Sequence, residues 1–63
     1  MNISNISEAV RLGTAYQYKL HALRYLEAAV KEVGEEEYRK HLEMEVRRLQ
    51  DELEDLEIQI KAL

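Results

Sequence analysis

A heptad repeat of apolar residues runs without interruption through the second half of this 63-residue chain. Residues that recur at alternating steps of four and three fall on one side of an α-helix, and a helix with such a stripe typically packs lengthwise against another helix. The chain has no proline and only two glycines, so nothing in its composition opposes long helices. The repeat therefore predicts an all-α fold of paired helices, and its members are Leu42, Val46, Leu49, Leu53, Leu56, Ile60 and Leu63.

The first half carries a second stripe with the same spacing. Only Lys19 interrupts it, and the aliphatic stem of a lysine can lie along apolar neighbours while its ammonium group reaches water. We therefore expect a second amphipathic helix, with its stripe formed by Ala9, Leu12, Tyr16, Lys19, Leu23, Leu26, Val30 and Val33.

The two stripes are out of phase across Gly34. Continued past the glycine, the first stripe would reach Met44, whereas the second stripe uses Val46. An offset of two residues rotates a stripe by about 200° on a helix, so a single straight rod would point its two stripes to opposite sides. Folding back at Gly34 lets them face each other. We predict one domain over residues 1–63, an antiparallel helical hairpin with a helix at about 5–33, a turn at 33–35 and a helix at about 35–62.

Local sequence signals agree with these boundaries. Asn5 and Glu8 have the spacing of a capping box at the start of the first helix. Lys31 would lie in the last turn of that helix, and Gly34 could adopt the left-handed conformation that often ends helices. The three glutamates at 35–37 would then interact favourably with the positive N-terminal end of the second helix.

A hairpin of this length has too small a core to be stable by itself, because single cores below roughly 70 to 80 residues supply only a few kcal/mol. The first helix also carries apolar residues beyond its stripe, with small alanines that permit close helix approach and tyrosines that favour interfaces. We therefore expect a homodimer, a four-helix bundle with the first helices at its centre, although a higher oligomer also satisfies the pattern. The expected dimer interface comprises Ala15, Tyr18, Ala22, Tyr25 and Ala29.

A parallel zipper of the second helix is a weaker alternative. Such a homodimer would set Glu52 against Glu57 of its mate, and like charges at these positions are unfavourable. A zipper with a basic foreign helix would avoid that repulsion.

No residue pattern predicts catalysis. The chain has no cysteine, which excludes disulfides and thiolate chemistry. His41 is four residues from both Glu37 and Glu45, but charged helices produce such pairs by chance, and we interpret them and His21 as surface residues. The carboxylates at 51–57 lie on an expected exposed face without a pocket that could shift a pKa. We therefore expect a non-enzymatic protein with no catalytic residue, no metal and no cofactor.

Charge and length narrow the choice of partner. The net charge is −4, and the excess acid lies entirely after Lys31, which favours a protein partner over nucleic acid. No apolar run approaches the length of a membrane span and no signal peptide is evident, so we expect a cytoplasmic protein that does not bind membranes. The resulting hypothesis is a small dimeric regulator, adaptor or inhibitor that binds an unidentified protein. Such a chain would suit a phage or mobile-element product.

The alternative hypothesis is RNA or DNA binding. Gln17, Arg24 and Lys31 recur every seven residues on the polar side of the first helix, and a dimer would double this modestly basic stripe. In length and layout the expected hairpin also resembles the plasmid copy-number regulator Rop, which recognises paired RNA loops. The resemblance is one of architecture and includes no residue motif. It implies an RNA-binding regulator that uses the polar face of its first helix.

Overall fold

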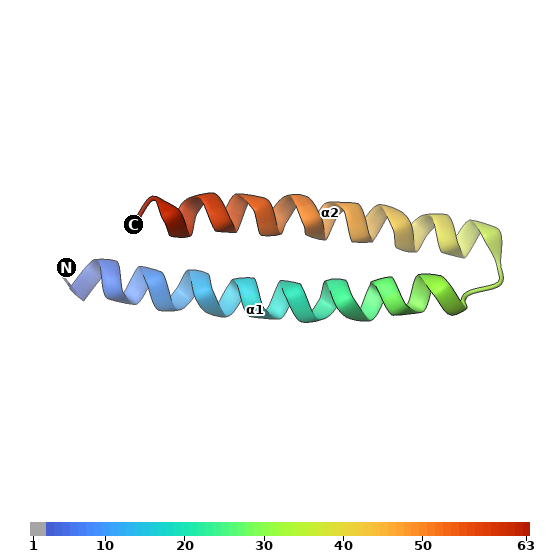
Figure 1. Ribbon diagram of the computed structural model, residues 1–63, viewed down its shortest axis with the longest axis horizontal. Helices are drawn as coiled ribbons and strands as arrows, with labels where there is room; N and C mark the ends of the chain where they lie inside the picture. Colours follow the sequence, from blue (N-terminus) through green and yellow to red (C-terminus); the bar gives the residue numbers. More distant parts are fainter. Residues whose placement is uncertain (1–2) are drawn as a thin grey trace.

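The computed structural model describes residues 3–63, and of Ile3 it describes the backbone alone. Two helices form the fold, α1 at Ile3–Glu32 and α2 at Glu36–Lys61. They run antiparallel and pack side by side, with the turn at one end and the start of α1 near the end of α2 at the other (Figure 1). The predicted all-α hairpin is confirmed. It is a rod with extents of 50 × 14 × 11 Å.

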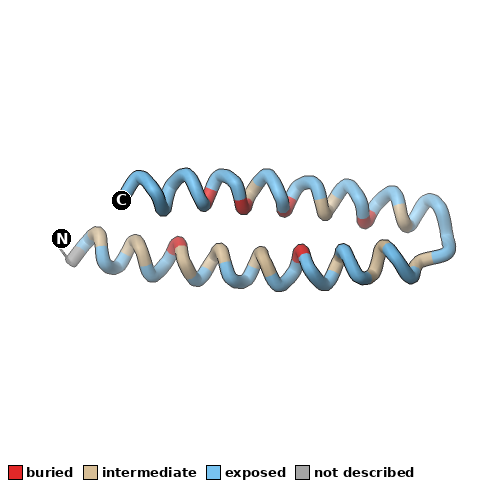
Figure 2. Tube along the Cα trace, in the orientation of Figure 1, coloured by how far each residue is buried: buried red, intermediate tan, exposed pale blue. Residues whose placement is uncertain are grey.

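The core is a single row of leucines between the two helices. Buried positions lie only on the facing sides of the tube in Figure 2, because each helix turns its heptad stripe toward the other. Leu23 of α1 packs with Leu49 and Leu53 of α2 at the centre, flanked by half-buried Tyr16 and Val46. The buried hydrophobic residues are Leu12, Leu23, Leu42, Leu49, Leu53 and Leu56.

The second stripe loses its cover toward the open end of the hairpin. Ile60 is 36% exposed and Leu63 is 43% exposed, whereas Leu56, one step earlier, is buried. At this end of the hairpin the stripe of α1 carries Ala9, whose small side chain covers less of a facing residue than a leucine would. Burial along the stripe of α2 therefore ends at Leu56, before the open end of the hairpin.

Glu35 starts α2 by capping it. Its backbone is extended, with φ −84° and ψ 124°, and its carboxylate accepts hydrogen bonds from the backbone N–H groups of Glu37 at 3.1 Å and Tyr38 at 3.2 Å. Two N–H groups that have no partner within the helix are satisfied in this way. The left-handed conformation expected at Gly34 is not adopted, because no described glycine has a positive φ. The chain therefore starts α2 with the side-chain cap of Glu35, and not with a left-handed glycine.

Arg39 of α2 also stabilises the turn, through contacts with the end of α1. Its guanidinium donates two hydrogen bonds to the Val33 carbonyl oxygen, from Nη2 at 2.8 Å and from Nε at 3.3 Å. The same guanidinium lies 3.4 Å from the Glu36 carboxylate. A carbonyl just beyond the end of a helix has no partner in the helix, and a cation there also interacts favourably with the helix dipole. One side chain of α2 thus holds the end of α1.

The capping box predicted at Asn5 is wrong. Helix α1 begins at Ile3, so Asn5 already lies inside the helix. Glu8 forms an ion pair with Arg11 three residues later. The hydrogen bond from Arg11, reinforced by the arginine charge, lowers the pKa of Glu8 below its ordinary value.

Candidate protein-interaction surface

Helix α1 has apolar side chains on sides that α2 does not cover. Tyr18 and Tyr25 are 76% and 75% exposed, and Val10 and Ile6 are 64% and 50% exposed. Helix α2 concentrates its buried residues on one side and is largely charged elsewhere. A helix that is apolar on several sides is normally enclosed by more than one neighbour. This difference makes the uncovered side of α1 the leading candidate for an interaction surface.

The five residues predicted to form a dimer interface make up one continuous strip, which we call the tyrosine–alanine seam: Ala15, Tyr18, Ala22, Tyr25 and Ala29. Ala22 is exposed and lies next in sequence to buried Leu23, so the seam is about a quarter turn away from the core. Ala15 and Ala29 are half-buried at its two ends. Around the helix, the alanines of the seam therefore lie nearer the hairpin core, and the two tyrosines lie farther out toward solvent.

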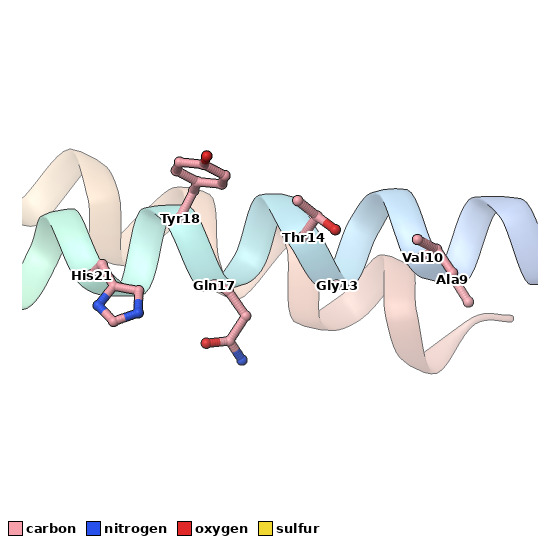
Figure 3. A pocket seen from close by; sticks show the side chains of 7 residues that line it. All are labelled: Ala9, Val10, Gly13, Thr14, Gln17, Tyr18 and His21. Carbon is pink, nitrogen blue, oxygen red and sulfur yellow. The ribbon is translucent and has the colours of Figure 1, made fainter.

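A second feature of this side is a hollow on the N-terminal half of α1. All the residues around it belong to α1, and Figure 3 shows Tyr18 on one side of the hollow with Gln17 and His21 on another. The missing side chain at Gly13 opens the space between Val10 and Gln17. Sequence reasoning missed the exposed apolar side chains of Ile6 and Val10, although their spacing of four residues outside the heptad stripe was a usable signal.

A chain of ion pairs borders the seam where α1 meets α2. Lys19 Nζ lies 2.5 Å from Glu52 Oε2, Arg48 Nε lies 3.6 Å from Glu52 Oε1, and Arg48 Nη2 lies 2.7 Å from Glu45 Oε2. Lys19 is three residues from Ala22 and four from Ala15, so this network forms a polar rim beside the apolar strip. The hydrogen bond from Lys19, together with the charges of Lys19 and Arg48, lowers the pKa of Glu52.

The three residues predicted for nucleic-acid contact all lie on the solvent side of α1. Gln17, Arg24 and Lys31 are each exposed, and neither Arg24 nor Lys31 forms an ion pair within residues 3–63. The nearby Tyr25 and Tyr18 are also exposed. The predicted dimer interface and the predicted nucleic-acid face thus lie on neighbouring sides of the same helix.

The outer face of α2 is acidic and carries isolated apolar side chains. Met44 is 72% exposed and Ile58 is 60% exposed. Three carboxylates near Ile58, those of Asp51, Glu54 and Asp55, form no ion pair with the described part of the chain. This face suits solvent or a basic partner.

The histidines and acids do not assemble into a catalytic or metal-binding cluster over the described range. His21 and His41 are exposed on different helices, and no group of three or more potential metal ligands occurs within residues 3–63. No helix in that range has both the length and the apolar character of a membrane span.

Comparisons with known protein families, with curated proteins and with solved structures find no match to this chain.

Proposed function

We propose that the protein is a non-enzymatic interaction module that forms a homodimer through α1 and binds another protein. The observation that carries the proposal is the exposure of Tyr18 and Tyr25 beside an alanine strip, on the side of α1 that α2 leaves uncovered. Tyrosine is enriched at interfaces, where its ring is buried while its hydroxyl group keeps a polar partner. Alanines between the tyrosines allow a second helix to approach closely.

The accessible surface supports a second copy as the occupant of the seam. The chain exposes 5093 Å². A compact monomer of the same mass exposes about 4200 Å², and the additional area of about 900 Å² is close to the roughly 800 Å² that each partner buries in a standard interface. A homodimer would bring the rod to the exposure of an ordinary folded protein.

Replacing Ala22 tests this interface. Ala22→Glu would place an unpaired charge between two packed helices, and we expect the dimer to dissociate in sedimentation experiments at micromolar concentration. Arg24→Glu is the matched control, because position 24 lies two residues away on the polar side of α1, and assembly should be unchanged. A monomeric wild-type protein, or an Ala22→Glu variant that dimerises normally, would contradict the proposal.

The second partner would contact α2. With α1 occupied by the second copy, the acidic outer face of α2 remains available, and the carboxylates of Asp51, Glu54 and Asp55, which form no ion pair within residues 3–63, favour a basic protein surface. A pull-down from native lysate with and without nuclease separates the two functional hypotheses. A protein that is retained after nuclease treatment supports the interaction module. Loss of all bound material supports nucleic acid.

RNA or DNA binding through α1 is the second candidate function. It is favoured by the exposure of Gln17, Arg24 and Lys31 and by the absence of intrachain ion pairs at the two basic residues within the described range. Phosphate contacts of this kind weaken with added salt. If this function is correct, Arg24→Glu should abolish nucleic-acid retention in a mobility-shift assay while the dimer persists.

A further inference from the structure

We infer that two copies of the chain pack antiparallel through α1, with each tyrosine of the tyrosine–alanine seam lying over an alanine of the partner subunit. The inference rests on the proposed homodimer and adds the orientation of the partner. It follows from the order of large and small side chains along the seam, from the charges at its two ends and from the direction of the helix dipole.

In a parallel dimer, every seam residue would meet its own copy. Layers of two alanines would alternate with layers of two tyrosines, because Ala15, Tyr18, Ala22, Tyr25 and Ala29 alternate in size. The distance between packed helices, roughly 8 to 10 Å, depends on the side chains at the contact. One separation cannot fit both kinds of layer, so the alanine layers would be left with voids that lose packing contacts.

In an antiparallel dimer, tyrosines and alanines face each other. Successive seam residues are alternately three and four positions apart. When one helix is reversed, a step of three in one chain lies beside a step of four in the other unless the two helices are shifted. The steps coincide only when a tyrosine position faces an alanine position, for example Tyr25 opposite Ala22 of the partner subunit and Tyr18 opposite Ala29 of the partner subunit. Every layer then contains one large and one small side chain, and one helix separation suits the whole seam.

The charges at the ends of the seam favour the same orientation. Arg11 is the next seam position on the N-terminal side, and Glu32 is the next on the C-terminal side. A parallel dimer would place Arg11 against its own copy and Glu32 against its own copy. An antiparallel dimer brings Arg11 of each chain toward Glu32 of the partner subunit, which replaces repulsion by attraction. It also sets the dipoles of the two α1 helices in opposite directions.

Single cysteines can report the orientation, because the chain contains no cysteine of its own. Ala15→Cys and Ala29→Cys are small changes that keep both tyrosines. With Tyr25 opposite Ala22 of the partner subunit, two copies of position 15 are about 25 Å apart along the axis and two copies of position 29 are about 16 Å apart, whereas position 15 lies near position 29 of the partner subunit. The probe is a short bismaleimide whose reach is well below the smaller of these two separations.

We expect neither variant to cross-link alone and the equimolar mixture to give a covalent dimer, with capture of up to about half of the chains because random exchange leaves that share in mixed dimers. Ala22→Cys is the positive control, since it lies near its own copy in either orientation and should cross-link. Covalent dimer from Ala15→Cys alone would show parallel packing and overturn the inference while leaving the homodimer intact. A dimer in which Ala22→Cys does not cross-link would overturn the seam as its interface. A wild-type monomer in sedimentation would instead overturn the proposed function.

Discussion

Gly13 lies in the interior of α1 without any conformational requirement for glycine. Its φ is not positive, and a Cβ added there would meet no atom within 4 Å. Glycine loses more backbone freedom on folding than alanine does, so it destabilises a helix interior. We predict that Gly13→Ala raises the free energy of unfolding by about 0.5 to 1 kcal/mol in urea titrations.

Ala28→Gly is the matched control for Gly13→Ala. Position 28 is exposed in the interior of α1, so the reverse change should lower the free energy of unfolding by a similar amount. A loss of stability in Gly13→Ala would contradict the open space around position 13. It would indicate that another molecule packs against the hollow.

The ion pair between Lys19 and Glu52 gives the hairpin a defined pH dependence. The pKa of Glu52 is lowered in the folded chain by the hydrogen bond from Lys19 and by neighbouring positive charge. This stabilisation is present above the unfolded glutamate pKa of about 4.3 and is lost as the pH falls through the lower folded value. We predict that the stability difference between the wild type and Glu52→Gln narrows as the pH falls from neutral through this window.

Urea titrations at neutral and acid pH measure that difference. Glu54→Gln is the control, because Glu54 is exposed and forms no ion pair within residues 3–63. Its offset from the wild type should change less with pH. Parallel pH curves for the wild type and Glu52→Gln would show that the contact contributes nothing to folding.

The position of Lys19 was predictable from sequence, but its partner was not. The heptad spacing places Lys19 in the core stripe, and its half-buried state agrees with that prediction. Glu52 is 33 residues away, and at the edge of a helix pair several acidic side chains lie within reach of a long, flexible lysine. Periodicity specifies which side of a helix is buried, whereas the choice of ion pair depends on rotamers and local geometry.

At the scale of the element, helix pairing was more predictable than helix ends. The leucine repeat identified four buried residues of α2, because one side of a paired helix must be apolar along its length. The ends depend on competition among side chains for free backbone groups. Glu35 caps the start of α2, whereas α1 begins at Ile3 and not at the expected cap, Asn5. Nothing in the spacing of apolar residues reports such contacts.

The turn depends on Arg39 more than on Gly34. Arg39 donates two hydrogen bonds to the Val33 carbonyl, and hydrogen bonds that involve a charged group contribute roughly 1.5 to 3 kcal/mol before partial exposure reduces them. We predict that Arg39→Gln lowers the free energy of unfolding by about 1 kcal/mol or more in urea titrations.

Lys40→Gln serves as the comparison for Arg39→Gln, since it removes a neighbouring exposed positive charge that forms no hydrogen bond or ion pair with the turn in the described range. We expect a change within about 0.5 kcal/mol. Equal effects of the two substitutions would mean that net charge, and not the bond to Val33, determines the loss.

At the scale of the whole molecule, the rod shape explains why we expect the chain to assemble. Not every feature of the expected interface could be predicted from the sequence. The radius of gyration is 14.9 Å, while a compact chain of this length has about 11 Å. Two helices side by side cannot enclose a core on all sides, so residues such as Tyr18 and Val10 are left uncovered. The candidate seam follows from spacing in the sequence. The polar rim beside it depends on the contact of Lys19 with α2, and that contact is known only from the structure.

Folding and association should therefore be linked, and melting should depend on protein concentration. When the native state is a dimer and the unfolded state is monomeric, mass action stabilises the native state as concentration rises. With an unfolding enthalpy of about 0.7 kcal/mol per residue, two chains of this length give an increase in Tm of about 6 °C for each tenfold rise in concentration. Thermal unfolding followed by circular dichroism over a hundredfold range of concentration measures this slope. Ala22→Glu, dissociated at the seam, should melt at a lower temperature with little dependence on concentration. A constant Tm in the wild type, with a cooperative transition, would show that a single hairpin folds alone and that the uncovered side of α1 contributes nothing to stability.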